Sequence, residues 1–174
     1  MAQPVKDSIP TLRWGIIGRF IPRISNTVLQ TNVVIATGWI ASAFVSDLLL
    51  DPEAHRDKNA VKHVIQAIGS SSTSKAKGFW SKLSPNSNIS EPSFYDSYSQ
   101  VYDDPNVDIV YIATPHSMHL ENTLDAINAG KHVLCEKPMT INARDTERLI
   151  TAAKSRGVFL MEGRSARFPY PKIG

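Results

Sequence analysis

The chain has 174 residues, of which 42% are hydrophobic and 20% charged, which is typical of one globular domain with a buried core. Its formal net charge of +3 comes without a dense run of Lys and Arg, so we expect neither a nucleic-acid partner nor a membrane surface. A single cysteine, Cys135, excludes an internal disulfide, and its apolar neighbours predict a buried thiol in a reducing compartment. Residues 1–10 are polar, so we expect a flexible N-terminus, no signal peptide and a cytoplasmic protein.

Beyond residue 30, short β-branched apolar runs alternate with amphipathic stretches. The first run, Thr31–Ile35, is typical of a strand, and Ile40, Phe44 and Leu48 follow at helical spacing. Further strands are predicted at 63–68, 93–95, 108–113, 132–135 and 158–161. Four further helices are predicted. The first runs from cap candidates at 70–73 to about Leu83, and the second lies around 98–102. The third contains Leu120, Leu124 and Ile127 and ends at Gly130, and the fourth runs from the cap Asn142 to Gly157.

The order of these elements predicts the fold class. Strands and helices alternate at least five times, which indicates an α/β fold with a doubly wound parallel sheet of Rossmann type and helices on both faces. Asp108–Ala113 is an almost continuous apolar run, as expected of a parallel strand that is covered on both sides. Ligands of such sheets bind at the carboxyl ends of the strands, where the strand order reverses. The turns that follow the strands therefore hold the candidate site residues.

The turn after Thr31–Ile35 reads Ala36-Thr37-Gly38-Trp39-Ile40-Ala41, a variant of the dinucleotide fingerprint G-x-G-x-x-G. Gly38 would let the backbone approach a pyrophosphate, and the following helix N-terminus would offer free N–H groups and a partial positive charge. The alternative is an ordinary tight turn.

The turn after the second predicted strand bears on the choice of cofactor. NAD-binding domains usually place Asp or Glu there to hold the ribose 2′-hydroxyl. This chain has Gly69-Ser70-Ser71-Ser72-Thr73, with Lys75 and Lys77 just beyond. Hydroxyls and cations suit a 2′-phosphate, which a carboxylate would repel, so Ser70, Ser71 and Lys75 favour NADP over NAD. The serines could also cap the next helix, and both roles are compatible.

Two later segments follow buried strands, namely Thr114-Pro115-His116-Ser117-Met118-His119 and Glu136-Lys137-Pro138. Proline fixes the backbone beyond Lys137, so its ammonium would project from a rigid position into the cleft. A lysine there could bind a substrate hydroxyl and assist proton transfer as a hydride leaves. The alternatives are a surface role for Lys137 and structural roles for His116 and His119. We expect no metal site.

Three stretches together, A-T-G-W-I-A, A-T-P-x-x-x-H and A-G-K-H-V-L-C-E-K-P-M, resemble the Gfo/Idh/MocA oxidoreductases. Within that family, the dihydrodiol dehydrogenase and NADP-dependent D-xylose dehydrogenase branch is the most similar, over roughly Leu12–Glu162. The resemblance implies a Rossmann domain that carries NADP(H), with Thr114, Pro115, His119 and Glu136 near the cofactor and Lys137 as the active-site lysine. It also implies the oxidation of sugars or trans-dihydrodiols by hydride transfer to nicotinamide.

The resembling family continues into a second α/β domain that covers the cofactor, and this chain ends at Gly174, about where that domain would begin. We therefore expect the second domain to be absent, residues 11–163 to form the dinucleotide-binding domain and 164–174 to form a tail. Water would then be poorly excluded, so weak cofactor binding and little turnover are expected. The alternative functions are a non-catalytic dinucleotide-binding module and an inactive truncated product. An exposed apolar patch and self-association are also expected.

The start of the chain contains a second candidate for the first strand. Leu12–Ile17 resembles the family's first strand and would normally run directly into Ala36-Thr37-Gly38. We interpret Gly18–Ile35 as an insertion, for example an unspliced intron read in frame. Its own strand-like end, Thr31–Ile35, competes with Leu12–Ile17 for the first position in the sheet, and the sequence leaves both arrangements open.

Overall fold

The computed structural model describes residues 11–17, 39–49, 62–83 and 89–163. In this part of the chain, six strands form one sheet in which every neighbouring pair is parallel, with the order β3-β2-β1-β4-β5-β6. The strands are β1 (Thr11–Ile17), β2 (Lys62–Gly69), β3 (Ser93–Tyr95), β4 (Ile109–Ile112), β5 (His132–Glu136) and β6 (Leu160–Gly163). This is the order of a doubly wound Rossmann sheet, and the strand order reverses between β1 and β4. The predicted fold class is confirmed.

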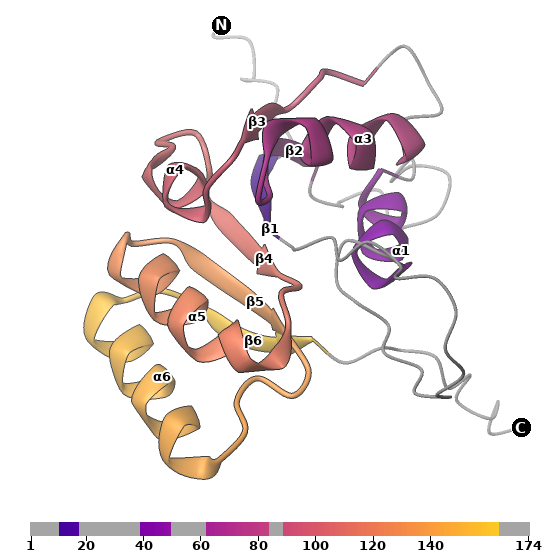
Figure 1. Cartoon of the computed structure of the whole chain (residues 1–174). Coiled ribbons are helices and arrows are strands. Elements are labelled where there is room, and N and C mark those ends of the chain that lie inside the picture. The colour runs from indigo at the N-terminus through magenta and orange to yellow at the C-terminus, as the bar shows by residue number, and fades with distance from the viewer. Residues whose placement is uncertain (1–10, 18–38, 50–61, 84–88, 164–174) are drawn as a thin grey trace, which may run out of the picture.

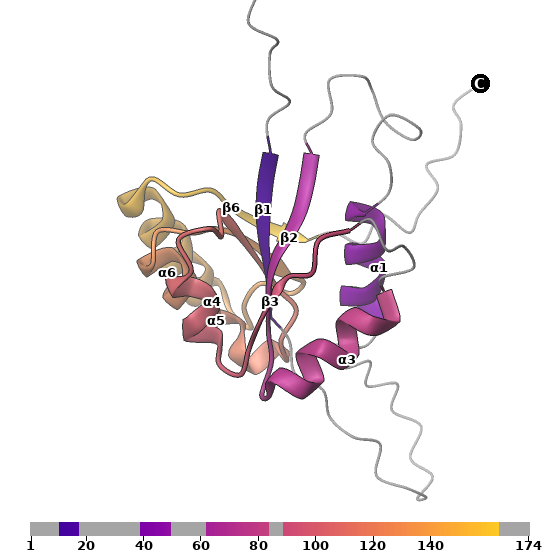
Figure 2. The same cartoon turned by 90° about the horizontal axis from the view of Figure 1, so that it is seen from above.

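Helices cover both faces of the sheet (Figures 1 and 2). The helices are α1 (Trp39–Leu48), α3 (Thr73–Leu83), α4 (Tyr98–Asp103), α5 (His119–Asn128) and α6 (Ala143–Arg156), and a short 3₁₀ turn, η1 (His116–Met118), precedes α5. Figure 2 shows α1 and α3 on one side of the sheet and α4, α5 and α6 on the other.

Strand β1 illustrates how the two cores are filled. Its side chains alternate across the sheet, so Trp14 and Ile16 are buried against α1 and α3, whereas Ile17 is buried with residues of α4, α5 and α6. Gly15 lies directly under α4, because a Cβ atom added there would approach Val101 Cγ1 to 2.6 Å. The strand is therefore held on both faces in the middle of the sheet.

The helix ends follow the predicted chemistry. The Asn142 side chain accepts a hydrogen bond from the Asp145 backbone N–H at 2.9 Å, which caps α6. Gly157 ends this helix in the left-handed region at φ +67°, a conformation that favours glycine. Gly130, at φ +75°, follows the end of α5. Ser72 accepts from the Lys75 N–H at 3.3 Å at the start of α3, so the serine turn does cap that helix.

The predicted strand ends differ most from the structure at the last strand, β6. Strand β6 spans Leu160–Gly163, not 158–161, because the Val158 N–H donates to Ala153 O and so belongs to the end of α6. The Phe159 N–H donates to His132 Nδ1, and regular pairing with β5 begins only at Leu160.

The structure places Leu12–Ile17 in the central strand, between β2 and β4. The competing segment Thr31–Ile35 lies outside the described residues, as do the rest of the proposed insertion (18–35), the N-terminal segment 1–10 and the tail 164–174. These parts of the sequence interpretation stay predictions.

Candidate functional site

A small hollow lies at the carboxyl ends of β4 and β5, beside the reversal in strand order. Its volume is about 90 Å³, and the residues that line it are Ile40, Ala113, Thr114, His116, His119, Glu136 and Lys137. It brings together the first turn of α1, the segment after β4 and the segment after β5, three parts of the chain that were singled out in the sequence. Its position is that of the ligand crevice in doubly wound sheets.

Of the predicted phosphate-binding turn, the structure describes only the helical end. Trp39 and Ile40 begin α1, and Ile40 lines the hollow. Ala36, Thr37 and Gly38 lie outside the described residues. Pro115 precedes η1 and is half-buried beside the hollow-lining residues Thr114 and His116.

Thr114 and His119 are linked by hydrogen bonds. His119 Nε2 lies 2.8 Å from the Thr114 carbonyl oxygen, and the Asn122 side-chain amide donates to the Thr114 hydroxyl at 3.0 Å. All three residues are buried, and His119 has no exposed surface. Their polar atoms therefore fix the segment after β4 from the first turn of α5.

Glu136 is held by a tyrosine that the sequence analysis did not select. The Tyr111 hydroxyl donates to Glu136 Oε1 at 2.6 Å, and the Lys137 N–H donates to Oε2 at 3.2 Å. Burial, followed by the hydrogen bond to Glu136, raises the pKa of Tyr111, so its hydroxyl stays protonated as a donor. The Tyr111 ring stacks on Phe44 of α1 with the ring centroids 4.0 Å apart. Glu136 is thus oriented from inside the sheet, whereas the Lys137 side chain is exposed.

The turn after β2 contains both exposed and buried polar side chains. The Lys75 ammonium donates to the Ser71 hydroxyl at 2.9 Å, and both residues are exposed. Ser70 is buried, with 1% of its surface exposed, and its N–H donates to Tyr95 O at 3.1 Å. Of the three predicted residues, Ser71 and Lys75 therefore offer their side chains to solvent, and Ser70 does not.

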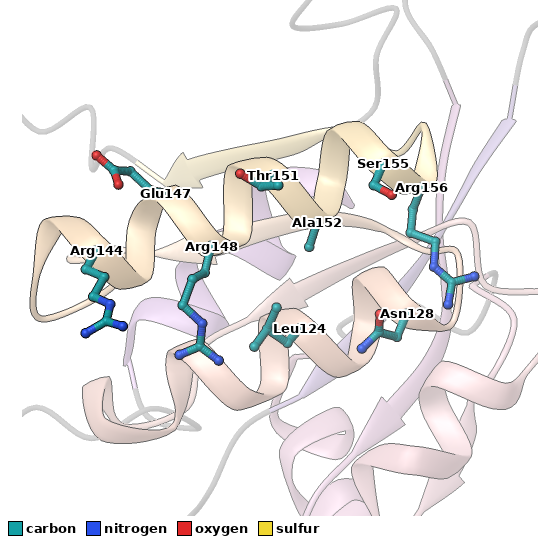
Figure 3. Close-up of a pocket in the computed structure, with 9 residues that line it drawn as sticks. All are labelled: Leu124, Asn128, Arg144, Glu147, Arg148, Thr151, Ala152, Ser155 and Arg156. Carbon is teal, nitrogen blue, oxygen red and sulfur yellow. The ribbon is translucent and has the colours of Figure 1, made fainter.

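A larger hollow lies between α5 and α6 (Figure 3), with a volume of about 630 Å³. The Arg144 and Arg148 side chains extend from α6 toward α5. The residues that line it are Leu124, Asn128, Arg144, Glu147, Arg148, Thr151, Ala152, Ser155 and Arg156. None of them belongs to the turns at the carboxyl ends of the strands, so the smaller hollow is the candidate site.

Two further findings concern the described residues only. They contain no group of three or more His, Cys, Asp or Glu side chains placed to hold a metal ion. Among their helices, none combines the length and the apolar character that crossing a membrane requires.

Sequence reasoning missed Tyr111, Asn122 and Glu162. Tyr111 was part of the apolar strand pattern, and no local signal distinguishes its hydroxyl from that of a core tyrosine. Glu162 Oε1 accepts from the Met139 N–H at 2.8 Å, a contact between residues 23 positions apart. Such contacts depend on which strands are neighbours in the sheet.

Residues 31–164 match the model of the GFO_IDH_MocA oxidoreductase family with an NAD-binding Rossmann fold. The NADP-dependent D-xylose 1-dehydrogenase of Hypocrea jecorina is 42% identical over 91% of this chain and 35% of the relative. The trans-1,2-dihydrobenzene-1,2-diol dehydrogenase of Sus scrofa is 37% identical over 80% of this chain and 38% of the relative. The chain therefore spans about a third of the length of these relatives.

Solved structures agree on the fold. A 3-ketoreductase from Actinomadura kijaniata, crystallised with NADP, has a TM-score of 0.64 and 28% identity over 88% of this chain and 38% of that chain. An NAD-binding oxidoreductase from Klebsiella pneumoniae has a TM-score of 0.68 over 90% of this chain and 35% of that chain. The family match begins at residue 31 and so includes Thr31–Ile35, whereas the structure has Thr11–Ile17 as β1. Because the family model matches residues 31–164 and the sheet has the Rossmann strand order, the chain belongs to the Gfo/Idh/MocA oxidoreductase family and has that family's NAD-binding Rossmann fold.

Proposed function

We propose that this chain forms the nucleotide-binding part of an NADP-dependent dehydrogenase that oxidises a hydroxyl group of a sugar or a trans-diol. One observation carries the proposal: Thr114, Glu136 and Lys137 meet the first turn of α1 at one hollow, beside the reversal in strand order. The substrate class comes from the activities for which the D-xylose and dihydrodiol relatives are named.

The described residues fit a dinucleotide at two places. The N-terminus of α1 would direct backbone N–H groups and a partial positive charge toward the pyrophosphate. The proposed binding turn comprises Ala36, Thr37, Gly38, Trp39 and Ile40, of which the first three lie outside the described residues. At the end of β2, the exposed Ser71 hydroxyl and Lys75 ammonium would meet the 2′-phosphate of NADP.

The charge around the β2 turn supports NADP over NAD. Residues 69–83 contain no Asp or Glu, so a 2′-phosphate there would meet no carboxylate from this segment. A carboxylate to hold the 2′-hydroxyl of NAD is missing from the same segment. Ser70 keeps a place in the proposed turn through its backbone, because its hydroxyl is buried.

The nicotinamide ring would supply the hydride acceptor. Lys137 would bind the substrate hydroxyl and, as a free amine, take up its proton while the hydride leaves. Glu136, oriented by Tyr111, would keep the adjacent Lys137 backbone in place through the 3.2 Å hydrogen bond. Thr114, Pro115 and His119 would form the wall of the site beside the ring.

A second candidate function is dinucleotide binding without turnover. It applies to the 174 residues taken by themselves, which match 35% of the D-xylose relative, so the contacts that the rest of such a relative makes are not made by this stretch. Orientation and exclusion of water contribute much of the rate of hydride transfer. We therefore expect the 174-residue chain alone to bind NADP with little turnover.

An absorbance assay of NADPH formation with D-xylose or trans-1,2-dihydrobenzene-1,2-diol distinguishes the candidates. Turnover that Lys137→Ala abolishes, and that a control change at the exposed Lys154 (Lys154→Ala) leaves intact, supports a dehydrogenase. NADP binding without turnover is compatible with both candidates, because the 174 residues by themselves are expected to turn over little substrate. Absence of NADP binding contradicts both.

A further inference from the structure

The short loop that carries Lys137 is held by two side chains from other parts of the chain. His119 reaches it from the first turn of α5, and Glu162 reaches it from strand β6. Neither contact is made by Lys137 itself, since the partners are backbone atoms of the next two residues, Pro138 and Met139.

His119 connects this loop to the one after β4. Its Nδ1 lies 2.8 Å from Pro138 O, and its Nε2 lies 2.8 Å from Thr114 O. Carbonyl oxygens only accept hydrogen bonds, so the imidazole must be the donor in both contacts. A neutral ring has one N–H group and can donate to only one of the two carbonyls, whereas a protonated ring can donate to both. The ring is also fully buried. Both ring nitrogens are thus occupied by the protein backbone.

Glu162 holds the loop from strand β6. Its Oε1 accepts the Met139 N–H at 2.8 Å, and hydrogen bonds to a carboxylate are stronger than those to a neutral acceptor. Glu162 pairs with Cys135 in the sheet, and the next residue, Gly163, pairs with Glu136. The carboxylate is therefore fixed to the same strand end from which the lysine loop leaves.

We propose that His119 and Glu162 are positioning residues, which fix the backbone on the C-terminal side of Lys137 so that its amine stays at the hollow. The proposal rests on the proposed function, in which Lys137 acts beside the nicotinamide. It gives His119 a role through the backbone and adds Glu162 to the site. A preorganised amine loses less conformational freedom when it engages a ligand, which is the benefit such a support provides.

Glu162 is the better residue to change, because it is exposed and its replacement leaves the core intact, whereas replacement of the buried His119 risks unfolding. The variants are Glu162→Ala, which removes the acceptor, and Glu162→Gln, which retains an oxygen at the same position. Glu147→Ala, at an exposed glutamate of α6, is the matched control.

Two nuclear magnetic resonance measurements on the 174-residue chain test the proposal. The first is amide hydrogen exchange at Lys137 and Met139 in the free protein, with Val110 and Val133 as core references. The second is the shift that NADP⁺ causes in the ¹³C-dimethyl signal of Lys137, assigned with Lys137→Arg. In Glu162→Ala we expect exchange at Met139 to accelerate about tenfold without change at the core references, and the Lys137 shift to fall by about half or more. Glu162→Gln and Glu147→Ala should stay within about twofold of the unaltered chain.

The two measurements separate this proposal from the proposed function. If NADP⁺ leaves the Lys137 signal of the unaltered chain unchanged, the proposed function fails, and hydrogen exchange alone then judges the support of the loop. Unchanged Met139 exchange in Glu162→Ala would overturn the proposal. Faster exchange together with a fully retained NADP⁺-induced shift would also overturn it, because the loop would be supported without positioning the amine.

Discussion

The Tyr111 hydroxyl donates a 2.6 Å hydrogen bond to Glu136 Oε1 and so connects the middle of the sheet to the residue that precedes Lys137. The same tyrosine ring stacks on Phe44 of α1. The helix whose N-terminus faces the proposed phosphate position and the strand end that carries the lysine are therefore linked through one side chain.

Removal of this hydroxyl should weaken both the fold and the site. Tyr111→Phe leaves Glu136 Oε1 without its donor, and we expect a loss of about 1–2 kcal/mol in the free energy of unfolding together with weaker NADP binding. Urea unfolding and calorimetric titration measure the two effects. Tyr95→Phe is the control, because the Tyr95 hydroxyl also donates to a carboxylate, Asp104 Oδ2 at 3.3 Å, but Asp104 does not line the hollow, whereas Glu136 does. Equal loss of NADP affinity in both variants would contradict the role of Tyr111.

The ion pair between Arg13 and Asp108 should make stability depend on pH. Arg13 Nε donates to Asp108 Oδ2 at 2.8 Å, and this hydrogen bond holds the pKa of Asp108 below its ordinary value. A lowered folded-state pKa contributes stability above the unfolded-state value, and the contribution is lost as the pH falls toward the folded-state value. Urea midpoints of Asp108→Asn should therefore be lower than those of the unaltered chain near pH 7. The gap should close below about pH 4. A gap that is constant over this range, or as large in Asp47→Asn at an exposed position, would contradict the assignment.

Cys135 should be inert in the folded chain. Burial raises the pKa of its thiol to about 12, and the residue has no exposed surface. At pH 8, a disulfide reagent should therefore react with Cys135 of the folded chain no faster than the protein unfolds locally around β5. In guanidinium chloride, where the chain is unfolded, the same reaction should be rapid. Rapid reaction of the native chain would show that β5 is accessible.

Gly15 should tolerate no larger residue under α4. A Cβ atom there would approach Val101 Cγ1 to 2.6 Å and Val107 Cγ1 to 3.0 Å, so Gly15→Ala should cost about 1–3 kcal/mol of unfolding free energy. The double variant Gly15→Ala/Val101→Ala should lose less unfolding free energy than the sum of the losses in the two single variants, because Val101→Ala removes the side chain with which the added Cβ atom clashes. Gly78→Ala, at a position with open space around the added atom, is the control. If the losses of the two single variants simply add in the double variant, the cost of Gly15→Ala does not come from a clash with Val101.

Cofactor preference should depend on Lys75. Lys75→Gln removes the ammonium beside Ser71, and we expect NADP affinity to fall about tenfold, or about 1.4 kcal/mol, with NAD affinity unchanged. Arg148→Gln removes one positive charge from the hollow between α5 and α6 and serves as the matched control. If both variants weaken NADP equally, general charge and not the β2 turn attracts the phosphate.

Local patterns were sufficient for most of the fold. Helix caps at Asn142 and Gly157 and the apolar run ending at Ala113 depend on neighbouring residues, and their predicted positions agree with the structure to within one residue. The start of β6 could not be predicted in this way, because the Val158 N–H is taken by the end of α6.

The site was predictable only in part, because some of its contacts join residues that are distant in the sequence. The turns after the strands are visible in the sequence, and the structure brings Thr114, His119, Glu136 and Lys137 together at one hollow. The partners that orient them, Tyr111 and Glu162, are separated from Glu136 and Met139 by 25 and 23 positions. Burial of the Ser70 side chain likewise depends on the neighbouring strand β3, whose Tyr95 carbonyl accepts its N–H.

The described Rossmann sheet should carry an NADP site at the ends of β1, β2, β4 and β5. Calorimetric titration of the 174-residue chain with NADP and, separately, with NAD tests it most directly. We predict saturable one-to-one binding of NADP that is at least about tenfold tighter than that of NAD. Equal affinity for the two would contradict the role given to Ser71 and Lys75, and no binding of either would contradict the site itself.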